Sequence, residues 1–114
     1  MRSAVVAMLL ALAAPAAAQD DAAKIEKGKQ VYTAQKCSIC HSIAGKGNKQ
    51  HPLDSVGAKL SADDIRKWIV SPKDMEAKLA TKPKVSMKAY PSLPAEELDA
   101  LVVYLRSLKA TPAP

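Results

Sequence analysis

The chain contains the stretch Cys37-Ser38-Ile39-Cys40-His41, which holds both of its cysteines and one of its two histidines. Such a pattern allows several kinds of chemistry. A disulfide between the two thiols is common in oxidising compartments. A thiol oxidoreductase uses the same cysteine spacing, but in a βαβ setting of which this sequence shows no sign. A closed zinc site needs four ligands and would use every cysteine and histidine in the chain.

The same spacing is also that of covalent haem attachment. Each thiol adds to one of two vinyl groups on adjacent pyrroles, and a two-residue spacer holds both sulfurs along one edge of the porphyrin. The residue after the second cysteine is then carried under the iron, where the imidazole of His41 can bind it. The stretch therefore predicts a haem site, with the other three chemistries as alternatives.

The composition favours a bound group in the core. With 114 residues, 48% of them hydrophobic and 25% charged, the chain forms one domain at most. Much of the apolar content is alanine, and the sequence has no Phe, one Trp and three Tyr. A chain this short with so few large side chains has difficulty filling a core by itself.

The first residues have the features of a secretory signal peptide. Arg2 is followed by an apolar run too short to span a bilayer and by a small-residue cleavage site ending at Ala18. A buried helix or a membrane anchor is the alternative. Cleavage would leave a domain over residues 19–110 and a flexible tail over 111–114, with 16 basic and 11 acidic residues. We therefore expect a periplasmic protein whose mature chain has no membrane span.

Apolar periodicity predicts helices at both ends of this domain. A first helix is expected over residues 24–36, where Gly28 and Tyr32 share a face. Because glycine costs a helix about 1 kcal/mol relative to alanine, Gly28 indicates that another helix crosses closely there, with Tyr104 and Leu105 meeting it. This last helix begins after Pro94. Its apolar stripe consists of Leu98, Leu101, Val102, Leu105 and Leu108.

Shorter helices and two long loops lie between. Ser61 is expected to cap a short helix, and one or two turns are expected over residues 74–79 after Pro72. Glycine and proline make residues 42–60 and 80–93 irregular. Loops of this length in a compact domain usually serve a function, such as wrapping a ligand. With no strand-like alternation, the fold class is all-α.

Taken together, the chain resembles a small class I cytochrome c of the bacterial kind. The resemblance covers nearly the whole mature sequence. It is carried by the haem motif and by five weaker stretches: Gly28 to Tyr32, Pro52-Leu53, Trp68-Ile69, Met87 to Tyr90, and Glu96 to Leu105. It implies the cytochrome c fold, three to five short helices around one covalently bound haem c, with Cys37 and Cys40 as thioether anchors and His41 as proximal ligand.

The resemblance also implies further site residues. Pro52 matches the proline whose carbonyl accepts a hydrogen bond from the proximal histidine, and Trp68 matches a tryptophan that donates its N–H to a haem propionate. Met87 is expected as the distal iron ligand. Met75, in a predicted helical segment, and His51, beside Pro52, are the other candidates.

The loop of the distal ligand departs from the family pattern at one position. Many relatives have proline after the methionine, whereas this chain has Lys88, which leaves the loop less rigid and adds a charge near the haem.

The implied function is that of a monohaem one-electron carrier and not of an enzyme. Such a carrier shuttles electrons between redox proteins, and lysines such as Lys46, Lys49 and Lys88 could steer partners with acidic docking faces. We expect a monomer that binds no nucleic acid. The alternatives are a haem c subunit of a larger oxidoreductase complex, a haem sensor with a labile sixth ligand, and a haem-free thiol–disulfide protein.

Overall fold

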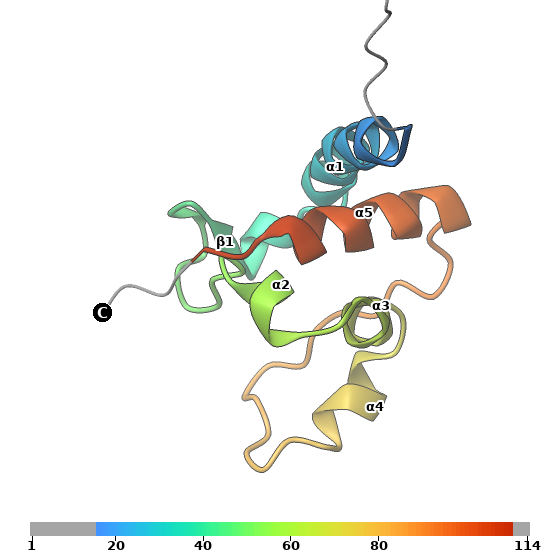
Figure 1. Ribbon diagram of the computed structural model, residues 1–114. Coiled ribbons are helices and arrows are strands. Elements are labelled where there is room, and N and C mark those ends of the chain that lie inside the picture. The colour runs from blue at the N-terminus through green and yellow to red at the C-terminus, as the bar shows by residue number, and fades with distance from the viewer. Residues whose placement is uncertain (1–15, 111–114) are drawn as a thin grey trace, which may run out of the picture.

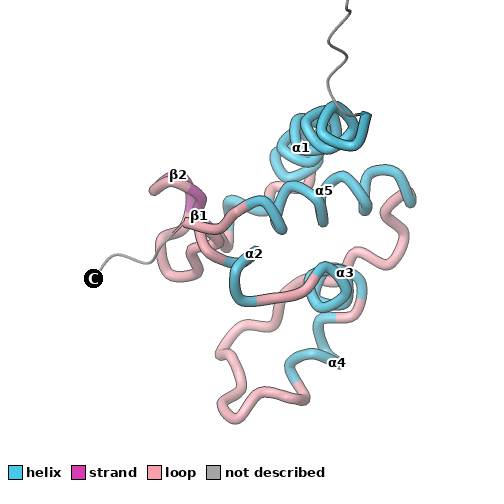
Figure 2. The backbone as a smooth tube through the Cα atoms, viewed as in Figure 1, coloured by secondary structure: helices cyan, strands magenta, loops and turns pink. Residues whose placement is uncertain are grey.

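The computed structural model describes residues 16–110, with side chains from residue 20 onward. Most of the expected signal peptide and the whole expected tail lie outside the described residues. The elements in chain order are α1 (Ala16–Ala34), the 3₁₀ helix η1 (Cys37–Ile39), β1 (Ser42–Ile43), β2 (Lys46–Gly47), α2 (Val56–Lys59), α3 (Ala62–Val70), α4 (Pro72–Glu76) and α5 (Ala95–Ser107). Figure 2 shows how loops connect these elements. The expected all-α class is confirmed.

Helices α1 and α5 cross closely, as Figure 1 shows. Gly28 is buried at the crossing, and a Cβ atom there would overlap the carbonyl oxygen of Ala100 and the Cβ of Tyr104. Beside it, the rings of Tyr32 and Tyr104 meet edge to face, with centroids 6.2 Å apart. The predicted reason for this glycine, a close helix crossing, is confirmed.

Helix α1 starts earlier and ends earlier than predicted. It runs over Ala16–Ala34 because the alanine-rich stretch before residue 24 contains strong helix formers. Lys36, which the prediction placed in the helix, has a φ of 57° in the left-handed region. That single residue ends the helix and turns the chain into η1.

Helix α3 packs its apolar face against α5. Ser61 caps it as predicted, because the Ser61 hydroxyl accepts a hydrogen bond of 3.1 Å from the Asp64 amide. Ile65 and Ile69 are buried, while Trp68 is only half-buried. The core cluster consists of Val31, Tyr32, Ile65, Ile69, Leu98, Leu101, Val102, Tyr104 and Leu105.

The segment 42–60, predicted to be irregular throughout, contains regular structure. Strands β1 and β2 pair as a two-residue antiparallel hairpin, and α2 forms one turn. Gly57 lies inside α2, where a Cβ atom would overlap the carbonyl oxygen of Arg106, and its amide donates to Leu108 (2.8 Å). This glycine therefore permits a close approach to the end of α5, a role that sequence periodicity does not distinguish from that of a helix breaker.

The second long loop matches its prediction. After α4, which covers residues 72–76 instead of 74–79, the chain has no helix or strand until α5 begins. In Figure 1 this yellow-to-orange segment swings away from α4 and returns to α5. None of the described helices combines the length and the apolar character needed to cross a membrane.

The crossing at Gly28 gives a direct test of the packing. Gly28→Ala gains about 1 kcal/mol of helix propensity, but the clash is with backbone that cannot rotate away. We expect a net loss of about 2 kcal/mol in the free energy of unfolding, measured by urea denaturation. Gln30→Ala, on the exposed side of the same helix, should change it by less than about 0.5 kcal/mol. Equal effects of the two substitutions would contradict the close crossing.

Candidate cofactor site

The Cys37–His41 motif forms one tight turn at the end of α1. The carbonyl oxygen of Cys37 accepts hydrogen bonds from the amides of Cys40 (3.1 Å) and His41 (3.0 Å). Both cysteines carry free thiols, and burial raises the pKa of the Cys37 thiol. Within the described part of the chain, no three His, Cys, Asp or Glu side chains gather as a metal cluster would.

The hairpin β1–β2 and Asn48, the residue that follows it, contact the backbone of this turn. The amide of Asn48 donates to the carbonyls of Ser38 and His41, both at 3.0 Å, and its side-chain amide donates to Ile39 (3.2 Å). Gly47 has a φ of 105°, and a Cβ atom there would overlap the carbonyl oxygen of His41. The hairpin thus contacts the backbone of the motif along most of its length.

One ring nitrogen of His41 is held by the backbone. Its Nδ1 lies 3.1 Å from the carbonyl oxygen of His51, which can only accept, so Nδ1 carries the proton. Burial lowers the pKa of His41, a hydrogen bond to His51 opposes this, and the nearby His51 ring adds to the lowering. A neutral imidazole with Nδ1 protonated has Nε2 free to bind a metal.

The acceptor differs from the prediction by one residue. We expected the carbonyl of Pro52, but the structure uses that of the preceding residue, His51. The segment is aligned by Ser42, whose amide donates to His51 (3.3 Å) and whose carbonyl accepts from Leu53 (2.8 Å). Because Pro52 has no N–H, it makes no hydrogen bond at its own amide between these two. Its own contact is the parallel bridge to Ser42.

A cavity of about 400 Å³ opens in front of the motif. Of the site residues predicted from the sequence, it brings together Cys37, Cys40, His41, Trp68 and Met87, and it does not include Pro52. Its other lining side chains are mainly apolar, among them Leu53, Val56, Ile65, Ile69, Leu101 and Leu105. Volume and lining are those of a site for an organic ligand.

The three candidates for the distal ligand differ in their position relative to this cavity. Met87 is half-buried in the loop before α5 and lines the cavity. Met75 is buried within α4, with 8% of its surface exposed, and is not among the lining residues. His51 lines the cavity but lies beside His41, their ring centroids 6.2 Å apart, on the proximal side.

Hydrogen bonds attach the loop that carries Met87 to the rest of the protein at two points. On one side, Glu76 accepts a hydrogen bond from the Met87 amide (3.2 Å) and one from the Ser86 hydroxyl (3.1 Å). On the other, Tyr90 donates through its amide to Ile69 (2.9 Å) and through its hydroxyl to Gln35 (3.3 Å). The residues that form both sets of hydrogen bonds line the cavity.

Glu76 is a site residue that sequence reasoning missed. An acidic residue near the end of a short helix normally lies in solvent, yet Glu76 is only 8% exposed and lines the cavity. The four-residue spacing puts Glu76 on the same helix face as Pro72, but only the structure shows that this face is buried.

Tyr32 adds a further polar residue to the cavity wall. Its hydroxyl is buried and has no hydrogen-bond partner among the described residues. Burial, helped by Cys37, Tyr104 and Asp54, raises its pKa to about 12. The hydroxyl therefore stays protonated at neutral pH and can donate to a polar group held in the cavity.

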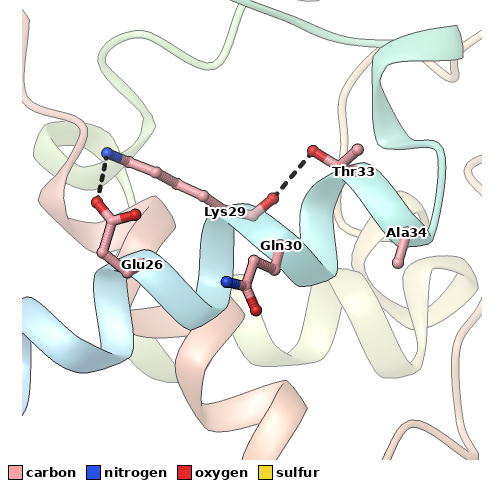
Figure 3. Close-up of a pocket in the computed structure, with 5 residues that line it drawn as sticks. All are labelled: Glu26, Lys29, Gln30, Thr33 and Ala34. Atoms are coloured by element: carbon pink, nitrogen blue, oxygen red, sulfur yellow. Dashed lines mark hydrogen bonds and ion pairs between the residues drawn. The ribbon is translucent and has the colours of Figure 1, made fainter.

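A different depression lies on the outer side of α1, and Figure 3 shows its five lining residues. Lys29 pairs there with Glu26 at 3.1 Å, and its carbonyl accepts from the Thr33 hydroxyl at 3.1 Å. These polar groups satisfy one another on an exposed helix surface. The groove contains none of the site residues predicted from the sequence.

Comparison with known proteins identifies the class to which this fold and site belong. Residues 25–109 match the family model for cytochrome c. The chain is also similar to cytochrome c oxidase subunit 2 of Alkalihalophilus pseudofirmus, with 30% identity over 92 residues that cover 73% of this chain and 25% of the relative. The chain thus spans about a quarter of that relative's length.

The chain belongs to the cytochrome c family. Membership implies covalently bound haem c and a role in electron transfer. The cavity fits that group, since it combines an apolar lining, two free thiols one turn apart, an imidazole with a free ring nitrogen and an unpartnered tyrosine hydroxyl.

The contact between Gly47 and the motif can be tested by substitution. Gly47→Ala adds a Cβ atom against the His41 carbonyl, so we expect it to cost about 1–3 kcal/mol more in unfolding free energy than Gly45→Ala. Gly45 is the matched control, because it also has a positive φ (77°) but nothing within 4 Å of its Cβ position. Thermal unfolding of both holoproteins measures the difference. Equal melting temperatures would show that the hairpin does not support the motif.

Proposed function

We propose that this chain is a periplasmic carrier of single electrons with one covalently attached haem c, which shuttles between larger redox proteins. Cys37 and Cys40 would form the thioethers, and His41 and Met87 would be the axial ligands. The observation that carries the proposal is that these four side chains line one cavity. Haem c, when bound, supplies an iron that takes up and releases one electron.

The proposed ligands explain why the protein would act as an electron carrier and not as a catalyst. His41 and Met87 would occupy both axial positions, so that no position on the metal stays open for a substrate. A thioether ligand favours ferrous iron and raises the reduction potential. The apolar lining of the cavity acts in the same direction, because low polarity disfavours the more highly charged ferric state.

Two further residues take subsidiary roles in this proposal. Trp68 lines the cavity and is half-buried, so its indole N–H can donate to a propionate while its ring packs. Pro52 would act through the backbone, since its bridge to Ser42 aligns the His51 carbonyl that accepts from His41.

Partner recognition would depend on exposed lysines near the motif and the Met87 loop. Lys46, Lys49 and Lys88 are all exposed, and the formal net charge of the chain is +6. Ile39, between the two cysteines, adds exposed apolar surface at the motif, with an exposed fraction of 67%. This combination suits brief docking to a partner with an acidic face. In this proposal the protein is a monomer, and residues 1–18 are a signal peptide that is removed.

A second candidate function is that of a haem c subunit in a larger oxidoreductase. It is favoured by the similarity to an oxidase subunit, of which this chain covers only a quarter. Gel filtration of the holoprotein purified under mild conditions separates the two candidates. Elution at the mass of one chain supports the free carrier, and co-elution with other redox subunits supports the complex.

Substitution of the methionines tests the ligand set. Ferric haem bound by a thioether has a characteristic charge-transfer band. We expect Met87→Ala to abolish this band and to lower the reduction potential. Met75→Ala is the matched control and should keep the band, because Met75 does not line the cavity. Loss of the band in Met75→Ala alone would contradict the assignment.

The salt dependence of electron exchange tests the role of the lysines. We expect the rate of oxidation of the ferrous protein by ferricyanide, an anion, to fall about tenfold between low salt and 0.15 M salt. Replacing Lys46, Lys49 and Lys88 together by glutamine should remove most of this dependence.

The control for that experiment removes the same charge elsewhere. Lys24, Lys59 and Lys109 are exposed and belong neither to the β1–β2 hairpin region nor to the loop that carries Met87. Their joint replacement by glutamine should leave most of the salt dependence in place. Equal losses in the two triple variants would show that only net charge matters and that no docking face exists near the haem.

A further inference from the structure

Glu76 is a buried carboxylate that the proposed function does not use. Glu76 is 8% exposed and is the last residue of α4. Burying a charged group is costly unless it is paired or hydrogen-bonded. The described ion pairs are Lys27–Glu96, Lys29–Glu26 and Arg66–Asp99, and none involves Glu76.

The partners of Glu76 are two consecutive residues of the distal loop. One carboxylate oxygen accepts from the Met87 amide at 3.2 Å, and the other accepts from the Ser86 hydroxyl at 3.1 Å. Hydrogen bonds to an ionised acceptor are stronger than neutral ones. Both carboxylate oxygens of Glu76 are thus hydrogen-bonded to the segment that carries Met87.

These two bonds matter because the loop has little else to hold it. Within the described part of the chain, they are the only hydrogen bonds made by residues 80–89. The next tie is Tyr90, which is fixed to Ile69 and Gln35. A methionine side chain also has three rotatable bonds, so its sulfur stays in place only if its backbone does.

We propose that Glu76 is a positioning residue for the distal ligand: by accepting from the Met87 amide and the Ser86 hydroxyl, it holds the Met87 thioether at the cavity. The inference rests on the proposed function, in which Met87 binds the iron. Glu76 would act through Met87 and not as a ligand itself. Its effect would be to raise the local concentration of the thioether at the bound haem.

Competition with an added ligand measures this effect. Imidazole displaces a weak sixth ligand from ferric haem, and loss of the thioether band reports the displacement. In the ferric holoprotein, Glu76→Ala should bind imidazole about 10- to 100-fold more tightly, since two hydrogen bonds that favour the closed loop are lost. Asp74→Ala, an exposed acidic residue on the same helix, should bind it as the wild type does.

A conservative variant separates hydrogen bonding from charge. In Glu76→Gln the amide oxygen can still accept from the Met87 amide, and the NH₂ group can donate to the Ser86 hydroxyl. This variant should keep the imidazole affinity within about threefold of the wild type. A change as large as that of Glu76→Ala would overturn the positioning role by hydrogen bonds.

Ser86→Ala keeps the test decisive even if Glu76→Ala does not yield holoprotein. Ser86 is exposed, so its loss does not threaten the core, and one missing bond should tighten imidazole binding about 3- to 10-fold. Unchanged affinity in Ser86→Ala, or in Glu76→Ala where it folds, overturns the inference alone. A wild-type protein without the thioether band overturns the proposed ligand set, and the inference with it.

Discussion

The close crossing of α1 and α5 at Gly28 is the contact on which the site depends. It holds α1, the helix that leads into the turn at Lys36 and the Cys37–His41 motif, against α5. Helix α5 also supplies part of the opposite wall of the cavity through Leu101 and Leu105. A larger residue at position 28 would push α1 and α5 apart, and both helices carry residues that line the cavity.

The two sides of the cavity are held in different ways. On the proximal side, the segment around His41 is held mainly by backbone groups of the hairpin region and of His51. On the distal side, Met87 lies in a loop with no regular structure and depends on Glu76, eleven residues earlier in the chain. Such an arrangement gives His41 a rigid setting and leaves the position of Met87 to be set by single side chains.

Much of the site could be predicted from residue types and spacing. The motif, the reason for Gly28, the cap at Ser61 and the irregular distal loop follow from local rules, because each depends on residues close in sequence or on one clear helical period. The errors share a different cause. The sequence predicts an irregular segment around Gly57 because the contact of this glycine with α5 is non-local. It also misplaces the acceptor for His41 by one residue, because Ser42 sets the register of that segment.

The sequence by itself determined the class of the fold and the chemistry of the motif, since cysteine spacing and helical periodicity are short-range properties of the chain. Only the tertiary structure decided which methionine reaches the cavity and which groups hold it there. Met75 and Met87 are equally apolar as residues, and they differ in the surface that each is folded against. Likewise, Glu76 became a site residue because folding buried its carboxylate beside the amide of Met87, a pairing that no local pattern specifies.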